Sequence, residues 1–126
     1  MIRRQEYRRG DLFLADLEPH FGSEQGGTRP VVVLQNNIGN IYCPTVIVAP
    51  MTSRCWKKPR QPTHCVLRDA EGLCEEVMVL AEQIRTLDKA RLRQYLGHLT
   101  DDQMQSVNDA VISSLGLEIP WEVEAP

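Results

Sequence analysis

Short apolar runs, separated by glycine, proline and asparagine, occupy the first two-thirds of the chain. Strand-like patterns lie at residues 11–17, 30–36, 45–52, 63–68 and 76–83, and those at 30–36 and 45–52 are rich in β-branched residues. The first alternates loosely between apolar and polar positions, as a half-buried strand does, whereas the second and third are continuous runs typical of buried strands. Turn-forming residues fill the gaps. The pattern therefore predicts five short strands joined by tight turns.

The last third of the chain has helical spacing instead. Residues 88–99 begin with Asp88, a suitable N-cap, and place four apolar residues at i, i+3, i+4 and i+7: Leu92, Tyr95, Leu96 and Leu99. We therefore predict a first helix here, with its apolar stripe in the core.

A second helix is predicted over residues 100–116. Thr100 and Gln103 have the spacing of a capping box, and Gly116 is suited to the C-terminal cap. The apolar stripe of this helix consists of Met104, Val107, Val111 and Leu115. Strands followed by helices indicate an α+β fold, and short strands with tight turns favour a small antiparallel β-barrel.

The length of 126 residues fits one domain, residues 1–126, with a basic N-terminal arm at 1–8 and a tail at 117–126. No apolar run is long enough to span a membrane, and the N-terminus lacks the apolar segment of a secretory signal. We therefore expect a cytoplasmic protein with no membrane partner.

Four cysteines (Cys43, Cys55, Cys65 and Cys74) form no C-x-x-C pair, and the three histidines are equally scattered. This spacing argues against a zinc site, and a cytoplasmic location argues against disulfides. We expect no metal and no cofactor.

Charge divides unevenly along the chain. Residues 1–68 carry 10 Lys/Arg and 5 Asp/Glu, a net of +5, whereas residues 69–126 carry 4 and 12, a net of −8. The basic half favours an anionic partner such as nucleic acid. The alternative is that these charges only decorate solvated faces.

Residues 22–30, with the sequence GSEQGGTRP, form a polar segment between two predicted strands, so we expect a hairpin loop. Gly26 and Gly27 fit ordinary turn geometry or a backbone that lies close to a ligand. Arg29 stands at the base of the loop, and Thr52 ends the third predicted strand. If the two strands are neighbours, guanidinium and hydroxyl meet as a phosphate-binding pair. The alternatives are a surface salt bridge for Arg29 and an ordinary strand residue at Thr52.

The loop after the third strand, residues 53–62, interleaves cations with an aromatic residue, Trp56. Bases stack on aromatic rings and phosphates pair with cations, so this composition suits single-stranded nucleic acid. The alternatives are an ordinary basic loop and a protein partner anchored by Trp56.

These segments resemble the MazF/PemK toxins, mRNA endonucleases of toxin–antitoxin pairs. The similar words are RGDLFLADLEP, GSEQGGTRPVVVLQN, PTVIVAPMTS, PTH and LAEQIRTLDKARL, which cover most of residues 9–115 in order. The resemblance implies an SH3-like barrel of about five to seven strands with flanking helices, working as a homodimer. It also implies metal-free, ribosome-independent cleavage of single-stranded mRNA at a short sequence, and a cognate antitoxin with a disordered inhibitory segment.

In such toxins the arginine and threonine of two of these words are the catalytic pair, which here are Arg29 and Thr52. Metal-free cleavage uses the neighbouring 2′-OH as nucleophile and yields a 2′,3′-cyclic phosphate and a 5′-OH. Arg29 suits charge stabilisation, whereas its permanent positive charge suits it poorly to proton transfer. Glu24 is a candidate proton acceptor, and a solvated carboxylate or an antitoxin contact is its alternative. His20 and His64 are less favoured bases.

Candidate RNA-binding residues carry groups that read base edges, pair with phosphate, stack on bases or allow close backbone approach. They are Ser23, Gln25, Gly27, Asn36, Ser53, Arg54, Trp56, Lys57, Lys58 and Gln83. Hairpin and strand-end hydrogen bonding is the alternative for the amide and hydroxyl members. The basic loop is individual to this chain, so no cleavage sequence is carried over from the family.

Two rival functions use the same fold. CcdB-like toxins poison DNA gyrase by protein binding, but they are expected to act through a C-terminal helix, and this chain ends in the polar WEVEAP. A peptide-binding SH3-like adaptor needs an aromatic-lined groove, and the chain has only seven aromatic residues.

Overall fold

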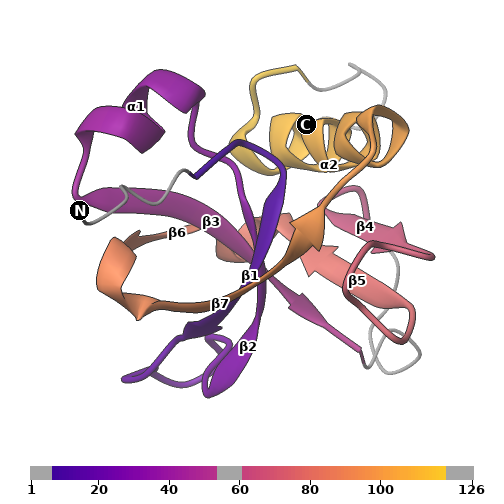
Figure 1. Cartoon of the computed structure of the whole chain (residues 1–126). Helices are drawn as coiled ribbons and strands as arrows, with labels where there is room; N and C mark the ends of the chain where they lie inside the picture. Colours follow the sequence, from indigo (N-terminus) through magenta and orange to yellow (C-terminus); the bar gives the residue numbers. More distant parts are fainter. Residues whose placement is uncertain (1–6, 54–60, 119–126) are drawn as a thin grey trace.

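The computed structural model describes residues 7–53 and 61–118. In this part of the chain seven strands, two α-helices and two 3₁₀ helices follow one another (Figure 1). The strands are β1 (Asp11–Asp16), β2 (Thr28–Val33), β3 (Thr45–Thr52), β4 (His64–Leu67), β5 (Val77–Leu80), β6 (Arg85–Asp88) and β7 (Leu92–His98). The helices are α1 (Asn37–Tyr42), η2 (Ala81–Gln83), η3 (Lys89–Arg91) and α2 (Asp101–Leu115).

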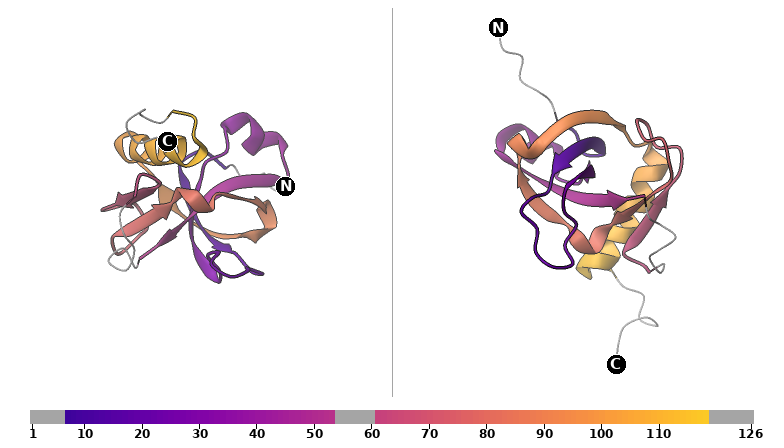
Figure 2. Two further views of the ribbon diagram at one scale, coloured as in Figure 1. Left: turned by 180° about the vertical axis from the view of Figure 1, so that it is seen from behind. Right: turned by 90° about the horizontal axis from the view of Figure 1, so that it is seen from below.

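The strands form one antiparallel sheet in the order β4-β5-β3-β2-β1-β7, with β6 also paired to β3. The long strand β3 pairs with β6 along its first half, with β2 in its middle and with β5 at its end. Pairing with three partners in succession requires the sheet to curl, as Figure 2 shows. The predicted α+β class with a small, curled antiparallel sheet is confirmed.

Both faces of the curled sheet are buried. Val32 and Met51 belong to a cluster covered by α2, which contributes Val107 and Ala110. Alternate residues of the same strands point into the second cluster, formed by Phe13, Ala15, Leu17, Val31, Val33, Val46, Val48 and Leu87. Because side chains alternate across a strand, a strand buried on both faces is apolar at every position. This explains the continuous apolar runs of β2 and β3.

The prediction of a helix over residues 88–99 is wrong. Asp88 does act as an N-cap, accepting a hydrogen bond from the Ala90 amide at 2.8 Å, but it caps only η3. The chain then continues as β7, which pairs with β1 and sets Tyr95 opposite Phe13. Pairing of β7 with β1 satisfies the β1 backbone along that side. Tertiary pairing therefore overrides the local helical spacing.

The helix predicted over residues 100–116 is confirmed as α2. Thr100 and Gln103 form the capping box, and Gly116 closes the helix with φ of 69°. The predicted stripe is right at Val107, which is fully buried, but Leu115 is 56% exposed. Only one α-helix thus follows the sheet in the described residues, in place of the two expected. Neither α-helix described has the length and apolar character needed to cross a bilayer.

Besides β7 and η3, two short elements, α1 and β6, were not predicted. The run expected over residues 30–36 ends as a strand at Val33, and Asn36 caps the short helix α1 by accepting a hydrogen bond from the Gly39 amide at 2.8 Å. Strand β6 follows η2 directly, after the segment expected as a strand over residues 76–83. Both elements are too short for a periodic pattern to define them.

Three of the cysteines lie in the described residues, and all three are free. Cys43 and Cys74 are exposed, whereas Cys65 is buried in the cluster under α2. Burial, together with the nearby Asp109 carboxylate, raises the pKa of the Cys65 thiol to about 11. Cys65 is therefore an inert core residue at neutral pH.

Candidate active site

The polar segment expected as a hairpin loop does join two paired strands. β1 and β2 are antiparallel, with Ala15 opposite Arg29, and residues 17–27 connect them. Arg29 Nε donates a hydrogen bond of 2.7 Å to the Gly26 carbonyl oxygen. Within the described residues no other protein group accepts a hydrogen bond from this guanidinium. Its terminal nitrogens are thus available to an anion.

Arg29 is on β2 and Thr52 is on β3, and these strands are neighbours, which was the condition set for the two residues to meet. The β2–β3 ladder ends where Val31 faces Pro50. Arg29 is two residues before Val31 and Thr52 is two residues after Pro50, so both lie just past the last paired residues of the β2–β3 ladder. Thr52 is buried, 3% exposed, and is held by its pairing with Met78 of β5. The two residues thus lie near the same end of the β2–β3 pair, but Thr52 lines neither of the two clefts described below.

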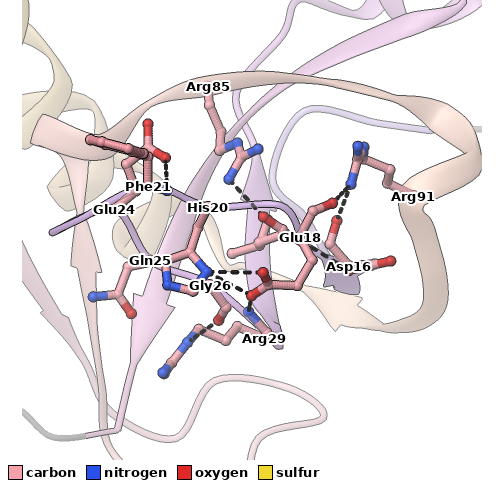
Figure 3. Close-up of polar contacts among 12 residues, drawn as sticks. Asp16, Glu18, His20, Phe21, Glu24, Gln25, Gly26, Arg29, Arg85 and Arg91 are labelled. Carbon is pink, nitrogen blue, oxygen red and sulfur yellow. Dashed lines mark hydrogen bonds and ion pairs between the residues drawn. The ribbon is translucent and has the colours of Figure 1, made fainter.

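A network around Glu18 fixes the loop beside Arg29 (Figure 3). The Glu18 carboxylate accepts hydrogen bonds from the Gly27 amide at 2.5 Å and from the His20 Nδ1 atom at 2.8 Å. The hydrogen bond from the Gly27 amide has the larger effect on the pKa of Glu18, and the contact with His20 has the next largest. Together they hold this pKa below its ordinary value of 4.5. Glu18 is thus ionised at neutral pH.

Two arginines, Arg85 in β6 and Arg91 in η3, hold the first residues of the loop. Arg85 Nη1 donates to the Leu17 carbonyl at 3.1 Å, and Arg91 Nη1 donates to the carbonyls of Asp16 and Glu18. The Glu18 amide, followed by Arg93, lowers the pKa of the Asp16 carboxyl. Sequence reasoning missed Glu18, Arg85 and Arg91. The only signal was that they fall within the words that carry the family resemblance.

Four predicted residues come together in one cleft of about 420 Å³, which we call the loop cleft. The Gln25 amide donates to Gln83 Oε1 at 2.7 Å, and Gln83 Nε2 donates to the Ser23 carbonyl at 3.4 Å. These bonds tie the loop to η2 across 58 and 60 positions of the sequence. The cleft is lined by Ser23, Glu24, Gln25, Pro50, Glu82, Gln83, Ile84 and Arg85.

Glu24, the candidate proton acceptor, lines this cleft but already has a partner. Its carboxylate accepts a hydrogen bond of 2.5 Å from the Phe21 amide, which closes a tight turn (Figure 3). The Phe21 ring is 86% exposed. An exposed ring on an ordered loop is a surface on which a nucleobase can stack.

A second cleft of about 420 Å³ lies at the end of the strands and brings together Arg29 and Ser53, two of the predicted residues. The gap between β1, β2 and the segment before β5 forms this strand-end cleft, which is lined by Leu14, Thr28, Arg29, Pro30, Met51, Ser53, Gly72, Leu73, Cys74, Glu75, Val77 and Leu96.

The remaining predicted residues are not gathered there. Gly27 is exposed in the loop with φ of 74°, and its amide binds Glu18. Arg29 lies at the start of β2, whereas Asn36 follows the end of this strand and caps α1. Arg54, Trp56, Lys57 and Lys58 lie outside the described residues.

Each histidine contacts a carboxylate. His64 Nε2 lies 2.7 Å from Glu82, which also lines the loop cleft, and His98 Nδ1 lies 2.7 Å from the buried Asp11. His20 contacts Glu18. Among the described residues no group of three or more His, Cys, Asp or Glu side chains is arranged to hold a metal ion.

Fold and site together define a small curled-sheet protein with a partly buried arginine, Arg29, at the base of a polar hairpin loop. Residues 8–115 match the model of the PemK-like, MazF-like toxins of type II toxin–antitoxin systems. The chain belongs to this family, and the resemblance expected from the sequence is confirmed.

Individual relatives agree with this assignment. Over 111 residues the chain is 53% identical to an endoribonuclease MazF of Staphylococcus saprophyticus, covering 87% of this chain and 92% of the relative. A MazF crystal structure from Deinococcus radiodurans has a TM-score of 0.76 at 29% identity, covering 90% of this chain and 99% of the other. A mycobacterial endoribonuclease in complex with its cognate antitoxin has a TM-score of 0.75 at 28% identity, with the same coverage.

Proposed function

We propose that the chain is the toxin of a type II toxin–antitoxin module and acts as a sequence-specific, ribosome-independent endoribonuclease on single-stranded mRNA. One observation carries this proposal: the Arg29 guanidinium is anchored through Nε at the base of a polar loop, on the strand next to the one that ends in Thr52. The endoribonuclease relatives support it.

The chemistry follows from the properties of these two side chains. A ribose 2′-OH attacks the adjacent phosphorus, the bond to the 5′ oxygen breaks, and the products are a 2′,3′-cyclic phosphate and a 5′-OH. Charge accumulates on the phosphate oxygens in the transition state. Arg29 offers two terminal nitrogens to those oxygens, and the Thr52 hydroxyl donates a further hydrogen bond. This reaction needs no metal or cofactor, because the nucleophile belongs to the substrate.

Proton transfer is the step for which the structure offers fewer groups. We assign Arg29 to charge stabilisation, since a guanidinium carries a fixed positive charge and has no acceptor. Glu24 lies on the loop and becomes a base for the 2′-OH when RNA displaces its turn contact with the Phe21 amide. His20 and His64 are the less favoured alternatives, because neither falls inside the two sequence segments that hold Arg29 and Thr52.

The RNA would run along the loop cleft. Phe21 offers a stacking surface, and the amides of Gln25 and Gln83 can read base edges. Backbone at Gly27 allows close approach. Further contacts are proposed from Ser23, Asn36, Ser53, Arg54, Trp56, Lys57 and Lys58.

We also propose a homodimer in the cytoplasm, where mRNA and a cognate antitoxin are both present. Solved relatives include an endoribonuclease bound to its cognate antitoxin and a MazE-MazF complex. The antitoxin of this chain would lay a disordered segment across the RNA-binding surface. The CcdB-like gyrase poison, the alternative function on this fold, is not favoured by these relatives.

The test is cleavage of a mixed-sequence single-stranded RNA in EDTA by the purified protein and by Arg29→Ala. We expect cleavage at one short sequence with 5′-OH ends, and a loss of at least about 10³-fold in the variant. Thermal unfolding of both proteins checks that the variant is folded. Absence of cleavage by a folded wild-type dimer would contradict the proposal, and a DNA supercoiling assay would then test the gyrase alternative.

A further inference from the structure

One peptide group lies between Glu18 and Arg29. The peptide joining Gly26 to Gly27 presents its carbonyl oxygen to Arg29 Nε, at 2.7 Å, and its N–H to a Glu18 carboxylate oxygen, at 2.5 Å. The C=O and N–H of a trans peptide lie in one plane and point in opposite directions. The two side chains therefore hold the same plane from opposite edges (Figure 3).

We propose that Glu18 is a positioning residue for Arg29. Its carboxylate fixes the plane of the Gly26–Gly27 peptide, and that peptide fixes the direction of the guanidinium. Bonding through Nε aims the two terminal nitrogens away from the loop backbone, because the guanidinium is a rigid planar fork. This inference rests on the proposed role of Arg29 in binding the reacting phosphate.

The space around Gly26 supports this assignment. A Cβ atom added to Gly26 would lie 2.1 Å from His20 Nδ1 and 2.6 Å from Glu18 Oε2. The carboxylate and the imidazole thus occupy the volume that any other residue at position 26 would fill. Gly27, with φ of 74°, is in the left-handed region that glycine adopts at low cost. Both glycines fit a backbone built around the carboxylate.

Loss of Glu18 is not expected to unfold the protein. The Glu18 side chain is 47% exposed and belongs to neither core cluster. Arg85 and Arg91 hold the base of the loop through backbone carbonyls, which remain in a Glu18 variant. A change in Glu18 should therefore alter the aim of Arg29 without changing the fold.

Kinetics on a single-site RNA form the first part of the test. Glu18→Ala should lower kcat by about 10- to 100-fold with KM changed less than about twofold, since misdirection of Arg29 weakens transition-state contacts. Glu18→Gln keeps an oxygen that can accept from the Gly27 amide, so it should recover most of this loss. Asp109→Ala is the matched control: it removes an exposed carboxylate that accepts a hydrogen bond from Gln105 on α2, at the other end of the molecule. It should leave kcat unchanged.

A double variant separates positioning from an independent role. In an Arg29→Lys background the Nε donor is absent, so adding Glu18→Ala should produce little further loss. If the two losses instead multiply, Glu18 acts independently of Arg29 and the inference is overturned.

A measurement without RNA tests the positioning role of Glu18 independently of the proposed RNA cleavage. The Arg29 Nε–H signal in ¹⁵N NMR should exchange slowly with water in the wild type and in Asp109→Ala, and should shift and exchange faster in Glu18→Ala. An unchanged signal in folded Glu18→Ala would overturn the positioning role, whatever the activity. If the signal changes but the wild type cleaves no RNA, the positioning role stands and the proposed function fails.

Discussion

Two polar networks lie near opposite ends of β2, and they differ in burial and charge. Before Arg29, the exposed Glu18 carboxylate binds the Gly27 amide. Beyond Val33, the buried amides of Gln35 and Asn40 bind each other and are 8% and 2% exposed. Figure 1 shows the hairpin loop and α1 on opposite sides of the sheet.

The buried network stabilises the fold. Gln35 Nε2 donates to Asn40 Oδ1 at 3.2 Å and to the Thr45 carbonyl at 3.0 Å, while Asn40 Nδ2 donates to the Gln35 carbonyl at 2.9 Å. Inside a protein each bond removed strands a polar group away from water. The exposed network adds little stability, because water replaces its bonds. We infer that one end of β2 determines stability and the other determines activity.

After Arg29→Ala, the largest loss of activity should come from Thr52→Val. A loss of stability instead of activity in this variant would contradict the comparison. Valine keeps the β-branched shape, so β3 should hold, while the lost hydroxyl should lower kcat by about 100-fold. Thr45→Val, at the other end of β3, is the control and should retain full activity. Cleavage rates and thermal unfolding of both variants measure the difference. Equal activity of the two variants would remove Thr52 from the site.

Asn40→Ala should lower stability and leave kcat unchanged. Removing this buried amide leaves Gln35 with fewer partners and should lower the free energy of unfolding by about 1–3 kcal/mol. Denaturant titration measures the loss, and kcat is measured well below the unfolding range. A variant with unchanged stability and reduced kcat would contradict the assignment of this end to the fold.

Gly26→Ala sharpens the comparison within the loop. The new Cβ collides with His20 and Glu18, so the carboxylate leaves the Gly27 amide and kcat should fall by about tenfold. Gly39→Ala, in α1, is the control at the opposite end, where the nearest atoms belong to the Gln35 side chain. Activity lost equally in both variants would show that the effect is not specific to the loop.

The smallest expected effect is a pH dependence of the loop. The pKa of Glu18 is lowered in the folded protein, so its contacts stabilise the loop fully above the ordinary value of 4.5 and are lost as pH falls through the lower folded value. The Gly27 amide shift, followed by NMR, should titrate below pH 4.5. Glu18→Gln should abolish that titration. A midpoint above the ordinary value would contradict the network.

Local signals in the sequence predicted part of the fold well. β3 was predicted with the bounds that it has, and the capping box of α2 lies at Thr100 and Gln103, because both depend on neighbouring residues. Strand β7 was missed because its conformation depends on pairing with β1, which is distant in the sequence. In the pair of Asp11 with His98, for example, the two residues are more than 80 positions apart. Spacing within the segment itself fitted a helix equally well.

The candidate site was likewise predicted only where local sequence carried the signal. Ser23, Gln25 and Gln83 were predicted from the family words, and the structure gathers them in the loop cleft. Arg91 was missed because it binds the Glu18 carbonyl, 73 positions away. Contacts to backbone carbonyls leave no residue-type signature in a single sequence, so positioning residues of this kind become visible only in the folded chain.

The most direct test compares Arg29→Ala with Asn40→Ala in one set of measurements, the cleavage rate of a single-stranded RNA and the free energy of unfolding. The account predicts that Arg29→Ala loses cleavage by at least about 10³-fold and keeps its stability, whereas Asn40→Ala loses about 1–3 kcal/mol and keeps its kcat. If Arg29→Ala cleaves RNA like the wild type, or loses activity only because it unfolds, the assignment of Arg29 to the active site is contradicted.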